Sequence, residues 1–176
     1  LSKEYYHLAE AMRDSSVIAD ASDILFQAYR QVGDYESGEP YVRTLLDIRL
    51  KQDNQDRKAS AHNLMAMFFS ETGDFSSAIY HFNEAIDIAR KYDIKARLFS
   101  PMNELGWLYF NANEFQQAIE LASDLYDLAA ESDNVERMLG AIYILNLSYR
   151  ELDLMEEAER WLDEGLVLIQ QSDRPE

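Results

Sequence analysis

Residues 65–86 read MAMFFSETGDFSSAIYHFNEAI. Before the pair Gly73-Asp74 the mainly apolar residues stand three, four or seven positions apart, and those after it follow the same spacing. The first set is Met65, Ala66, Phe69 and Thr72, and the second is Phe75, Ala78, Ile79, Phe82, Ala85 and Ile86. These offsets place side chains on one face of an α-helix, and a two-residue turn makes successive helices antiparallel. The stretch therefore predicts a helical hairpin.

The pattern of this hairpin recurs every 40 residues. Small residues occupy one position of the repeat: Gly38, Ala78, Ala118 and Ala158. Three positions earlier stand Tyr35, Phe75, Phe115 and Met155, and nine positions earlier stand Tyr29, Phe69, Tyr109 and Tyr149. A constant period indicates stacked copies of one structural unit. The small residue would let two helix backbones approach closely.

Alignment at this period predicts four helix pairs. The first helices are expected at about 17–32, 56–72, 94–111 and 135–152, and the second at about 35–50, 75–92, 115–132 and 155–171. Their turns are Gly33-Asp34, Gly73-Asp74, Asn113-Glu114 and Asp153-Leu154. Glycine and asparagine tolerate the positive φ that ends many helices, whereas Asp153 fits that chemistry less well. Asp53, Asp93 and Asp133 recur between the pairs, where an aspartate can cap the next helix.

Two prolines test these boundaries. If the second helix of the first pair starts at Ser37, Pro40 lies in its first turn, where a missing amide donor costs little. Pro101 lies several residues into the first helix of the third pair. That helix either kinks at Pro101 or starts at Ser100. We favour the kink, because Ala96 and Leu98 precede the proline in helical register.

The charge of the chain narrows the classes of partner. Its 33 acidic and 16 basic residues give a formal net charge of −17, which argues against binding to nucleic acid. There are no cysteines, which fits a reducing compartment, and no stretch reaches the roughly 20 apolar residues of a membrane helix. No secretory signal opens the chain. We therefore expect a cytoplasmic protein that binds no membrane.

The repeat resembles the tetratricopeptide repeat, in its long, 40-residue variety. The resemblance is closest in the second pair, with Met65-Ala66, Phe69, Gly73-Asp74-Phe75, Ala78, Phe82 and Ala85. The third pair follows with Leu105-Gly106, Tyr109, Asn113-Glu114-Phe115 and Ala118, and the first with Tyr29, Gly33-Asp34-Tyr35 and Gly38. The fourth pair departs most, because Asn146 replaces the small residue and Gly165 stands where alanine is usual.

The resemblance implies an all-α fold, a right-handed superhelical solenoid of antiparallel helix pairs with about nine helices. Residues 1–15 would be the second helix of an incomplete preceding repeat, and residues 173–176 a tail. Between them we expect four repeats, at about 16–52, 53–92, 93–132 and 133–172. Apolar residues at both ends lack a covering unit, which suggests a stretch of a longer protein or ends that pair with another copy.

No motif of catalysis or cofactor binding occurs. The sequence contains no GxxxxGK[ST], GxGxxG or GxSxG, and the three histidines lack metal-ligand spacing. His62 stands in a packing position of its helix, and His81 is expected on the outer face beside Phe82. We expect no enzyme, no catalytic residues, no cofactor and no metal. An enzyme of an unrecognised type would instead require a deep pocket with perturbed carboxylates.

The family's concave face, lined by the first helices, supplies the candidate binding residues. Projected onto this chain, the partner-binding positions are Gln27, Arg30, Asn63, Met67, Asn103, Trp107, Phe110, Tyr143, Leu147 and Arg150. Further positions on that face are Asp20, Asp23, Ser60 and Ser70. We expect Met67, Trp107, Phe110 and Tyr143 to cluster as an apolar patch suited to a peptide or helix. Alternatively, Trp107 and Phe110 pack within a narrow superhelix or against a missing segment.

The leading hypothesis is a non-enzymatic module that binds a protein or peptide through its concave face. Repeats of this length resemble those of scaffold proteins and bacterial signalling regulators, so we expect a sensor or scaffold segment of a larger protein. Family members that clamp peptide C-termini use Lys, Arg and Asn on this face. That subtype is disfavoured, because no Lys and two aspartates stand there. The alternative function is self-association into homo-oligomers through the groove or the terminal helices.

Overall fold

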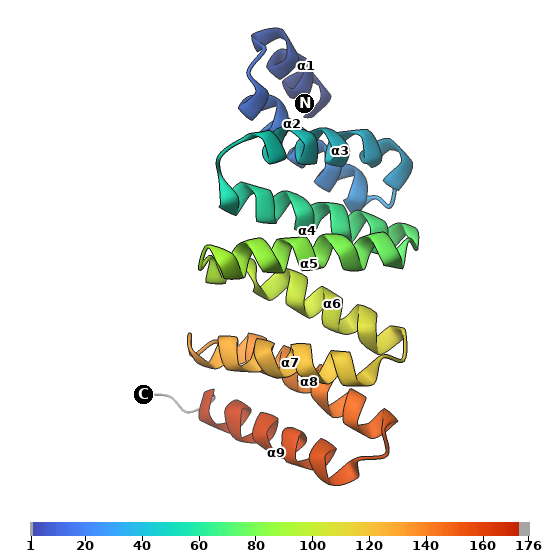
Figure 1. The fold of residues 1–176 in the computed structure, drawn as a ribbon, viewed down its shortest axis with the longest axis vertical. Helices are drawn as coiled ribbons and strands as arrows, with labels where there is room; N and C mark the ends of the chain where they lie inside the picture. Colours follow the sequence, from blue (N-terminus) through green and yellow to red (C-terminus); the bar gives the residue numbers. More distant parts are fainter. Residues whose placement is uncertain (1, 173–176) are drawn as a thin grey trace. The chain divides into compact units, whose positions relative to one another are not determined.

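The structure is a computed structural model that describes residues 2–172 (Figure 1). The elements are α1 Ser2–Met12, α2 Ser15–Gln31, α3 Tyr35–Lys51, α4 Gln55–Thr72, α5 Phe75–Lys91, η1 Lys95–Arg97, α6 Phe99–Asn111, α7 Phe115–Ala130, α8 Val135–Glu151 and α9 Met155–Ser172. η1 is a short 3-10 helix, and no strand occurs among the described residues. The predicted tail, residues 173–176, lies outside them.

Each Gly-Asp turn both ends one helix and starts the next. Gly73 has a φ of 86°, a left-handed conformation that an L side chain would strain. The carboxylate of Asp74 then accepts a 3.1 Å bond from the amide of Ser77 and caps α5. Gly33 and Asp34 repeat this arrangement before α3, with a φ of 73° at Gly33. The predicted turn chemistry is confirmed here, and Asn113 and Asp153 also adopt positive φ.

The prediction that Asp53, Asp93 and Asp133 cap helices is wrong. Asn54 and Asn134, one position later, cap α4 and α8 through bonds of 3.0 Å to backbone amides. Asp93 and Asp133 instead have φ values of 52° and 48°, so they end the preceding helices in the left-handed conformation.

Both proline interpretations need correction. Helix α3 begins at Tyr35 rather than Ser37, so Pro40 is its sixth residue and leaves the exposed Glu36 carbonyl without its usual helical donor. The helix predicted at 94–111 is not kinked but divided. The 3-10 helix η1 ends at Arg97, and α6 then begins at Phe99 with Pro101 in its first turn. A proline there displaces no helical hydrogen bond, which explains why α6 starts just before it.

The chain divides into two compact units, residues 1–97 and residues 98–176. In unit 1, α2 packs against α1 and α3, and α4 packs against α3 and α5. Its core contains Ala19, Phe26, Val42, Leu45, Ala61, Leu64, Met65 and Phe68. The rings of Phe26 and Phe68 meet edge to face at 6.4 Å, which joins α2 to α4.

In unit 2, α8 contacts α6, α7 and α9. Ile144 and Leu145 of α8 are fully buried against the alanines of α7, Ala118 and Ala122. The departure at Asn146 has a structural reason, because its amide donates a 2.8 Å bond to the carbonyl of Ala158 in α9. The polar residue thus holds the last helix pair together where other repeats use a small side chain.

The repeated small residues lie buried, as the close approach of helices requires. Ala78, Ala118 and Ala158 are all buried, as is Gly38. At Gly38 an added Cβ would lie 3.2 Å from the Cβ of Tyr29, closer than side-chain carbons usually approach. The absence of a side chain therefore permits the contact between α2 and α3 in the first helix pair.

Candidate functional site

Two helices of unit 2, α6 and α8, present six of the predicted binding residues. Asn103, Trp107 and Phe110 follow one another at helical offsets of four and three on α6. Tyr143, Leu147 and Arg150 do the same on α8, which packs directly against α6. We call these six residues the α6–α8 face. The other sides of the two helices hold the buried residues of the core, so this face is the one left for a partner.

An aromatic cluster occupies the middle of the α6–α8 face. The Trp107 ring meets Phe110 edge to face with centroids 5.8 Å apart, and it meets Tyr143 at 5.4 Å. Trp107 and Phe110 also pack against the core of unit 2, which fixes their rings. Tyr143 remains 57% exposed. The cluster is thus a rigid apolar surface with one open edge, a feature typical of an anchor for a partner's side chain.

A cavity of about 450 Å³ opens toward the N-terminal ends of α6 and α8. Its lining residues are Phe99, Ser100, Asn103, Glu104, Leu125, Glu136, Arg137 and Gly140. The Arg137 guanidinium lies 3.7 Å above the centre of the Phe99 ring, a close cation–π contact. At Gly140 an added Cβ would meet only the Asn103 side chain, at 3.9 Å, so the missing side chain leaves room. The cavity therefore offers hydrogen-bonding and charged groups beside the aromatic cluster.

The predicted binding residues of unit 1 form contacts with other side chains of that unit. The Arg30 guanidinium pairs with Glu71 at 2.7 Å. Met67 packs beside the unit 1 core, and its sulfur lies 3.8 Å from the amide nitrogen of Asn63. Gln27 lies exposed on α2 and bonds the carboxyl of Asp23, whose pKa is nonetheless raised because burial disfavours its charged form. Met67 belongs to unit 1 and the three aromatic residues belong to unit 2, so their expected grouping stays a prediction.

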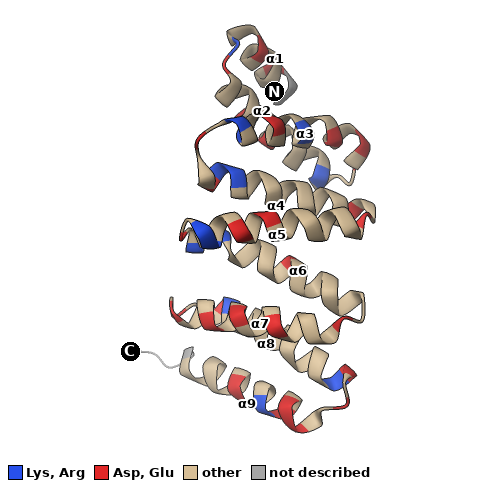
Figure 2. Cartoon of the chain, in the orientation of Figure 1, with Lys and Arg blue, Asp and Glu red and all other residues tan. Residues whose placement is uncertain are grey.

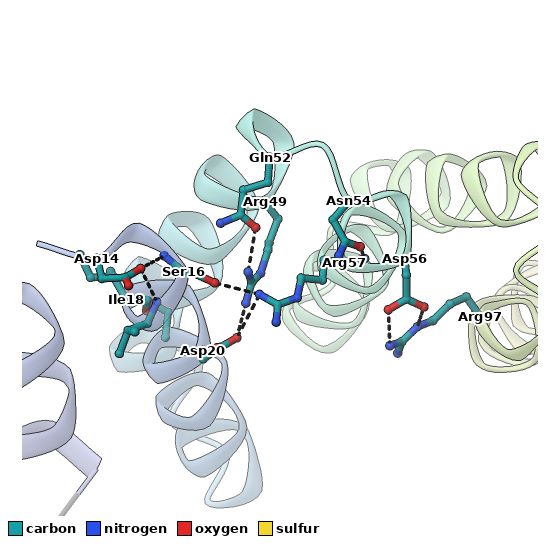
Figure 3. Close-up of polar contacts among 12 residues, drawn as sticks. Asp14, Ser16, Ile18, Asp20, Arg49, Gln52, Asn54, Asp56, Arg57 and Arg97 are labelled. Carbon is teal, nitrogen blue, oxygen red and sulfur yellow. Dashed lines mark hydrogen bonds and ion pairs between the residues drawn. The ribbon is translucent and has the colours of Figure 1, made fainter.

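Unit 1 contains a network of ion pairs that the sequence patterns did not predict (Figure 3). Arg49 is only 4% exposed, yet its guanidinium pairs with Asp20 and donates a 2.8 Å bond to Gln52. The Arg57 guanidinium reaches Ser16 at 2.9 Å and the Asp20 carboxylate at 3.9 Å. Asp20, an expected groove residue, is therefore committed to joining α2, α3 and α4. It is not available as a free charge on a binding surface.

A second ion pair joins η1 to α4. The Arg97 guanidinium makes two bonds to Asp56, of 2.7 and 2.9 Å, and these bonds hold the pKa of Asp56 below its ordinary value. A sequence signal for these contacts exists, because Arg57, Arg97 and Arg137 recur at the 40-residue period. Arg57 and Arg97 each reach back 41 positions to an oxygen-bearing side chain, whereas Arg137 has Ala96 at that distance. Arg137 stacks on Phe99 instead.

His62 and His81 form a pair that sequence spacing did not reveal. Their Nδ1 atoms lie 3.0 Å apart, so α4 and α5 are joined by an imidazole–imidazole hydrogen bond. Burial, together with the nearby His62, lowers the pKa of His81 to about 4, and burial also lowers the pKa of His62. The expectation that His81 lies on the outer face is wrong, because its ring also stacks on Phe69 at 5.6 Å. The packing role expected for His62 matches its burial.

Residues 2–172 contain no cluster of three or more His, Cys, Asp or Glu side chains with the geometry of a metal site. Across the same residues, every helix is too short or too polar to span a bilayer.

Comparison with known proteins identifies the repeat. Residues 25–91 match the tetratricopeptide repeat family, which confirms the resemblance seen in the sequence. No curated protein matches the chain. Among solved structures, the chain is similar to BtubC (BKLC) from P. vanneervenii, with a TM-score of 0.88 and 18% identity. That alignment covers 99% of this chain and 74% of BtubC.

Two further structures share the fold. Aspartyl phosphate phosphatase F from Bacillus subtilis aligns with a TM-score of 0.86 and 16% identity over 97% of this chain, which spans 45% of the phosphatase. A signal transduction ATPase with numerous domains from Pyrococcus horikoshii, which has a tetratricopeptide repeat sensor, aligns with a TM-score of 0.66 and 18% identity. That alignment covers 97% of this chain and 33% of the ATPase. At these identities the likeness establishes the fold, and it confirms the predicted all-α array of helix pairs.

Proposed function

We propose that this chain, whose repeats are of the tetratricopeptide type, binds a protein or peptide through the α6–α8 face. The observation that carries the proposal is the aromatic cluster of Trp107, Phe110 and Tyr143. Its inner rings are fixed by the core while the Tyr143 ring is open to solvent. A partner's apolar side chain would bury this surface at a small entropic cost, because the rings are already ordered.

The cavity beside the cluster supports recognition of a polypeptide rather than of an apolar surface alone. Asn103 carries both a donor and an acceptor, which suits the amide groups of an extended chain. Arg137 and Glu136, at the same cavity, supply one charge of each sign. The partner in this proposal places an apolar side chain on the rings and its backbone or a polar side chain at the cavity. Gln27, Arg30, Asn63 and Met67 stay proposed partner-binding positions of unit 1, taken by itself.

The wider biological role in this proposal is that of a non-enzymatic sensor or scaffold segment. Support comes from the two solved structures of which this chain spans less than half, one of them an ATPase with a repeat-built sensor. The chain would act by binding, next to other domains, in the cytoplasm. The net charge of −17 supports a protein partner over nucleic acid.

Selection of peptides on the purified chain tests this proposal. A displayed library of random dodecapeptides is selected on the wild-type chain, and the affinities of enriched peptides are measured by calorimetry. Trp107→Ala should weaken binding by about 1–3 kcal/mol, because it removes the centre of the aromatic cluster. Tyr143→Ala should act in the same direction and serves as the second variant, since the exposed Tyr143 ring contributes less to folding than Trp107.

The matched control is Tyr92→Ala, which removes an exposed aromatic ring from the end of α5 in unit 1. Its affinity for the selected peptides should equal that of the wild type. Peptides that bind the Trp107 and Tyr143 variants as tightly as the wild-type chain would refute the α6–α8 face as the binding site.

Self-association is the second candidate function, and an apolar strip on α9 favours it. Leu162, Leu166 and Ile169 follow at offsets of four and three and are 54%, 48% and 43% exposed. The positions 40 residues earlier on α7 are Ala122, Tyr126 and Ala129, and there the two alanines are fully buried where α8 packs against α7. The strip on α9 thus occupies the repeat positions at which α7 packs against the following helix, α8.

Sedimentation velocity over a hundredfold range of concentration separates this candidate from peptide binding. Self-association predicts a rising mean mass that Leu162→Gln with Leu166→Gln abolishes. A constant monomer mass would eliminate it and leave the peptide-binding proposal intact.

A further inference from the structure

The net negative charge of the chain is concentrated in unit 2. Residues 98–176 contain 17 acidic and 4 basic residues, whereas residues 1–97 contain 16 and 12. Within the helices of unit 2 the acidic residues lie mainly on α7 and α9, and α6 and α8 carry few (Figure 2). The charge therefore accompanies the second helices of the hairpins rather than the α6–α8 face. A surface of this kind attracts basic segments over a distance of about 10 Å.

A second cavity opens among these acidic helices. It has a volume of about 470 Å³, within the range of about 300–1,000 Å³ typical of ligand sites. We call it the α7–α9 pocket, and its lining residues are Tyr126, Arg160, Trp161, Asp163, Glu164 and Val167. The residues from α9 stand at offsets of three and four, so one face of that helix forms a wall. Tyr126 comes from α7.

The aromatic and acidic side chains of this pocket are held in place by one another. The Tyr126 ring meets Trp161 edge to face at 5.1 Å, and its hydroxyl donates a 2.8 Å bond to Glu164. Burial and the neighbouring Glu164 raise the pKa of Tyr126 to about 12, so the phenol stays a neutral donor. Trp161 also packs against the unit 2 core. The Glu164 carboxylate is thus oriented beside a fixed indole ring.

We propose that the α7–α9 pocket binds an arginine side chain from a basic segment of a partner protein. A guanidinium stacks on aromatic rings and bonds carboxylates through two parallel N–H groups, which matches Trp161 beside Asp163 and Glu164. Its aliphatic stem would lie along the half-exposed Val167. This site lies on α7 and α9, whereas the proposed peptide-binding face lies on α6 and α8. The two proposals are therefore independent. Its occupant is defined by charge, because carboxylates outnumber the single cation, Arg160, in the lining.

A single-tryptophan variant provides the assay. The chain has two tryptophans, so Trp107→Phe leaves Trp161 as the only indole, and its fluorescence reports on the pocket. The probe is the acetylated tetrapeptide amide Gly-Arg-Leu-Gly, compared with the same peptide carrying citrulline in place of arginine. Citrulline keeps the shape and planarity of the side chain but lacks the charge, and its carbonyl oxygen accepts hydrogen bonds where arginine has a donating nitrogen. We expect saturable quenching by the arginine peptide and about three- to tenfold weaker binding of the citrulline peptide.

Three variants locate the interaction within this background. Glu164→Gln should weaken the arginine peptide by about three- to tenfold, whereas Glu156→Gln removes an equal charge from the first turn of α9, outside the pocket, and should change binding less than twofold. Arg160→Gln should tighten binding by about two- to fivefold, because it removes the competing cation. Circular dichroism confirms that each variant is folded.

The outcomes are decisive in both directions. Equal affinity for the arginine and citrulline peptides, or the absence of saturable quenching at millimolar peptide, would overturn the proposal. Equal effects of Glu156→Gln and Glu164→Gln would show diffuse attraction to the acidic helices rather than a site. Weaker binding of the arginine peptide to Arg160→Gln would also overturn the proposal, because removal of a competing cation should strengthen binding of a guanidinium. The arginine site is supported only if the citrulline peptide binds more weakly than the arginine peptide and if Glu164→Gln, but not Glu156→Gln, weakens binding of the arginine peptide.

Discussion

Acidification should destabilise unit 1 through the His62–His81 pair before the carboxylates of the chain titrate. The bond between the two Nδ1 atoms, 3.0 Å apart, requires one ring to donate and the other to accept, so both rings must be neutral. Protonation of the acceptor would place two N–H groups against each other. Glu84 favours the charged form of His81, and Arg43 disfavours it, but burial is the largest influence on its pKa.

The sign and size follow from the difference between folded and unfolded states. The unfolded His81 ring has a pKa near 6.5 and the folded one about 4, so the unfolded chain binds more protons between these values. The stabilisation is complete above pH 6.5 and is lost as the pH falls toward 4. For these two pKa values, the free energy of unfolding falls by about 2 kcal/mol between pH 8 and pH 5. Because the His81 ring is partly exposed, solvent screening reduces this loss to about 1–2 kcal/mol. The lowered pKa of His62 acts in the same direction.

The measurement is urea unfolding, followed by circular dichroism at pH 8, 6.5 and 5, for the wild type and His81→Gln. Glutamine keeps a hydrogen-bonding group toward His62 but does not titrate. The difference between the two proteins removes the effect of the acidic surface, whose self-repulsion weakens at low pH in both. The wild type should lose about 1–2 kcal/mol more than His81→Gln between pH 8 and pH 5.

His7→Gln is the matched control, since this variant removes an exposed imidazole from α1, outside the pair. It should follow the wild-type pH dependence. Parallel curves for the wild type and His81→Gln would refute the reasoning, and so would a His81 resonance that titrates near pH 6.5 in NMR spectra of the folded chain.

Two further predictions concern packing and charge. Gly38→Val should cost about 1–3 kcal/mol of unfolding free energy, because its Cβ would lie 3.2 Å from that of Tyr29, whereas Gly140→Ala should stabilise by about 0.5–1 kcal/mol. Equal effects of both variants in urea unfolding would show that the spacing of α2 and α3 is not limiting. Arg97→Gln should cost about 0.5–1 kcal/mol at low salt and little at 1 M salt, because its bonds to Asp56 are partly exposed. It should also raise the pKa of Asp56 toward the ordinary value, and an unchanged carboxyl titration by NMR would contradict that assignment.

Much of the fold could be read from the sequence because it depends on local chemistry. Helix periodicity requires only the spacing of apolar residues such as Phe82 and Ala85, and the Gly-Asp turns require only a residue that tolerates positive φ followed by a side-chain acceptor. The recurrence of small residues every 40 positions predicted that the helices approach one another closely. Wrong expectations arose where two local signals compete. Asp93 and Asp133 suit both a helix cap and a left-handed helix end, and the neighbouring Asn134 caps α8 in place of Asp133.

The ring contacts of the α6–α8 face show which contacts a periodic sequence pattern can predict. Trp107 and Phe110 share one helix, so their proximity follows from a three-residue offset. The contact of Trp107 with Tyr143 depends on the distance and angle between α6 and α8, which the pattern leaves open.

The sequence by itself determined the apolar periodicity of the helices, their turns, the 40-residue repeat and the net charge of −17. Only the tertiary structure decided which charges are paired and which side chains share a cavity. The reason is physical: a helix places its residues by a fixed rotation and rise, whereas Asp20 with Arg49, His62 with His81, and Tyr126 with Glu164 meet across separate helices. These contacts depend on side-chain rotamers and on the packing between helices. No single stretch of the chain encodes either of them.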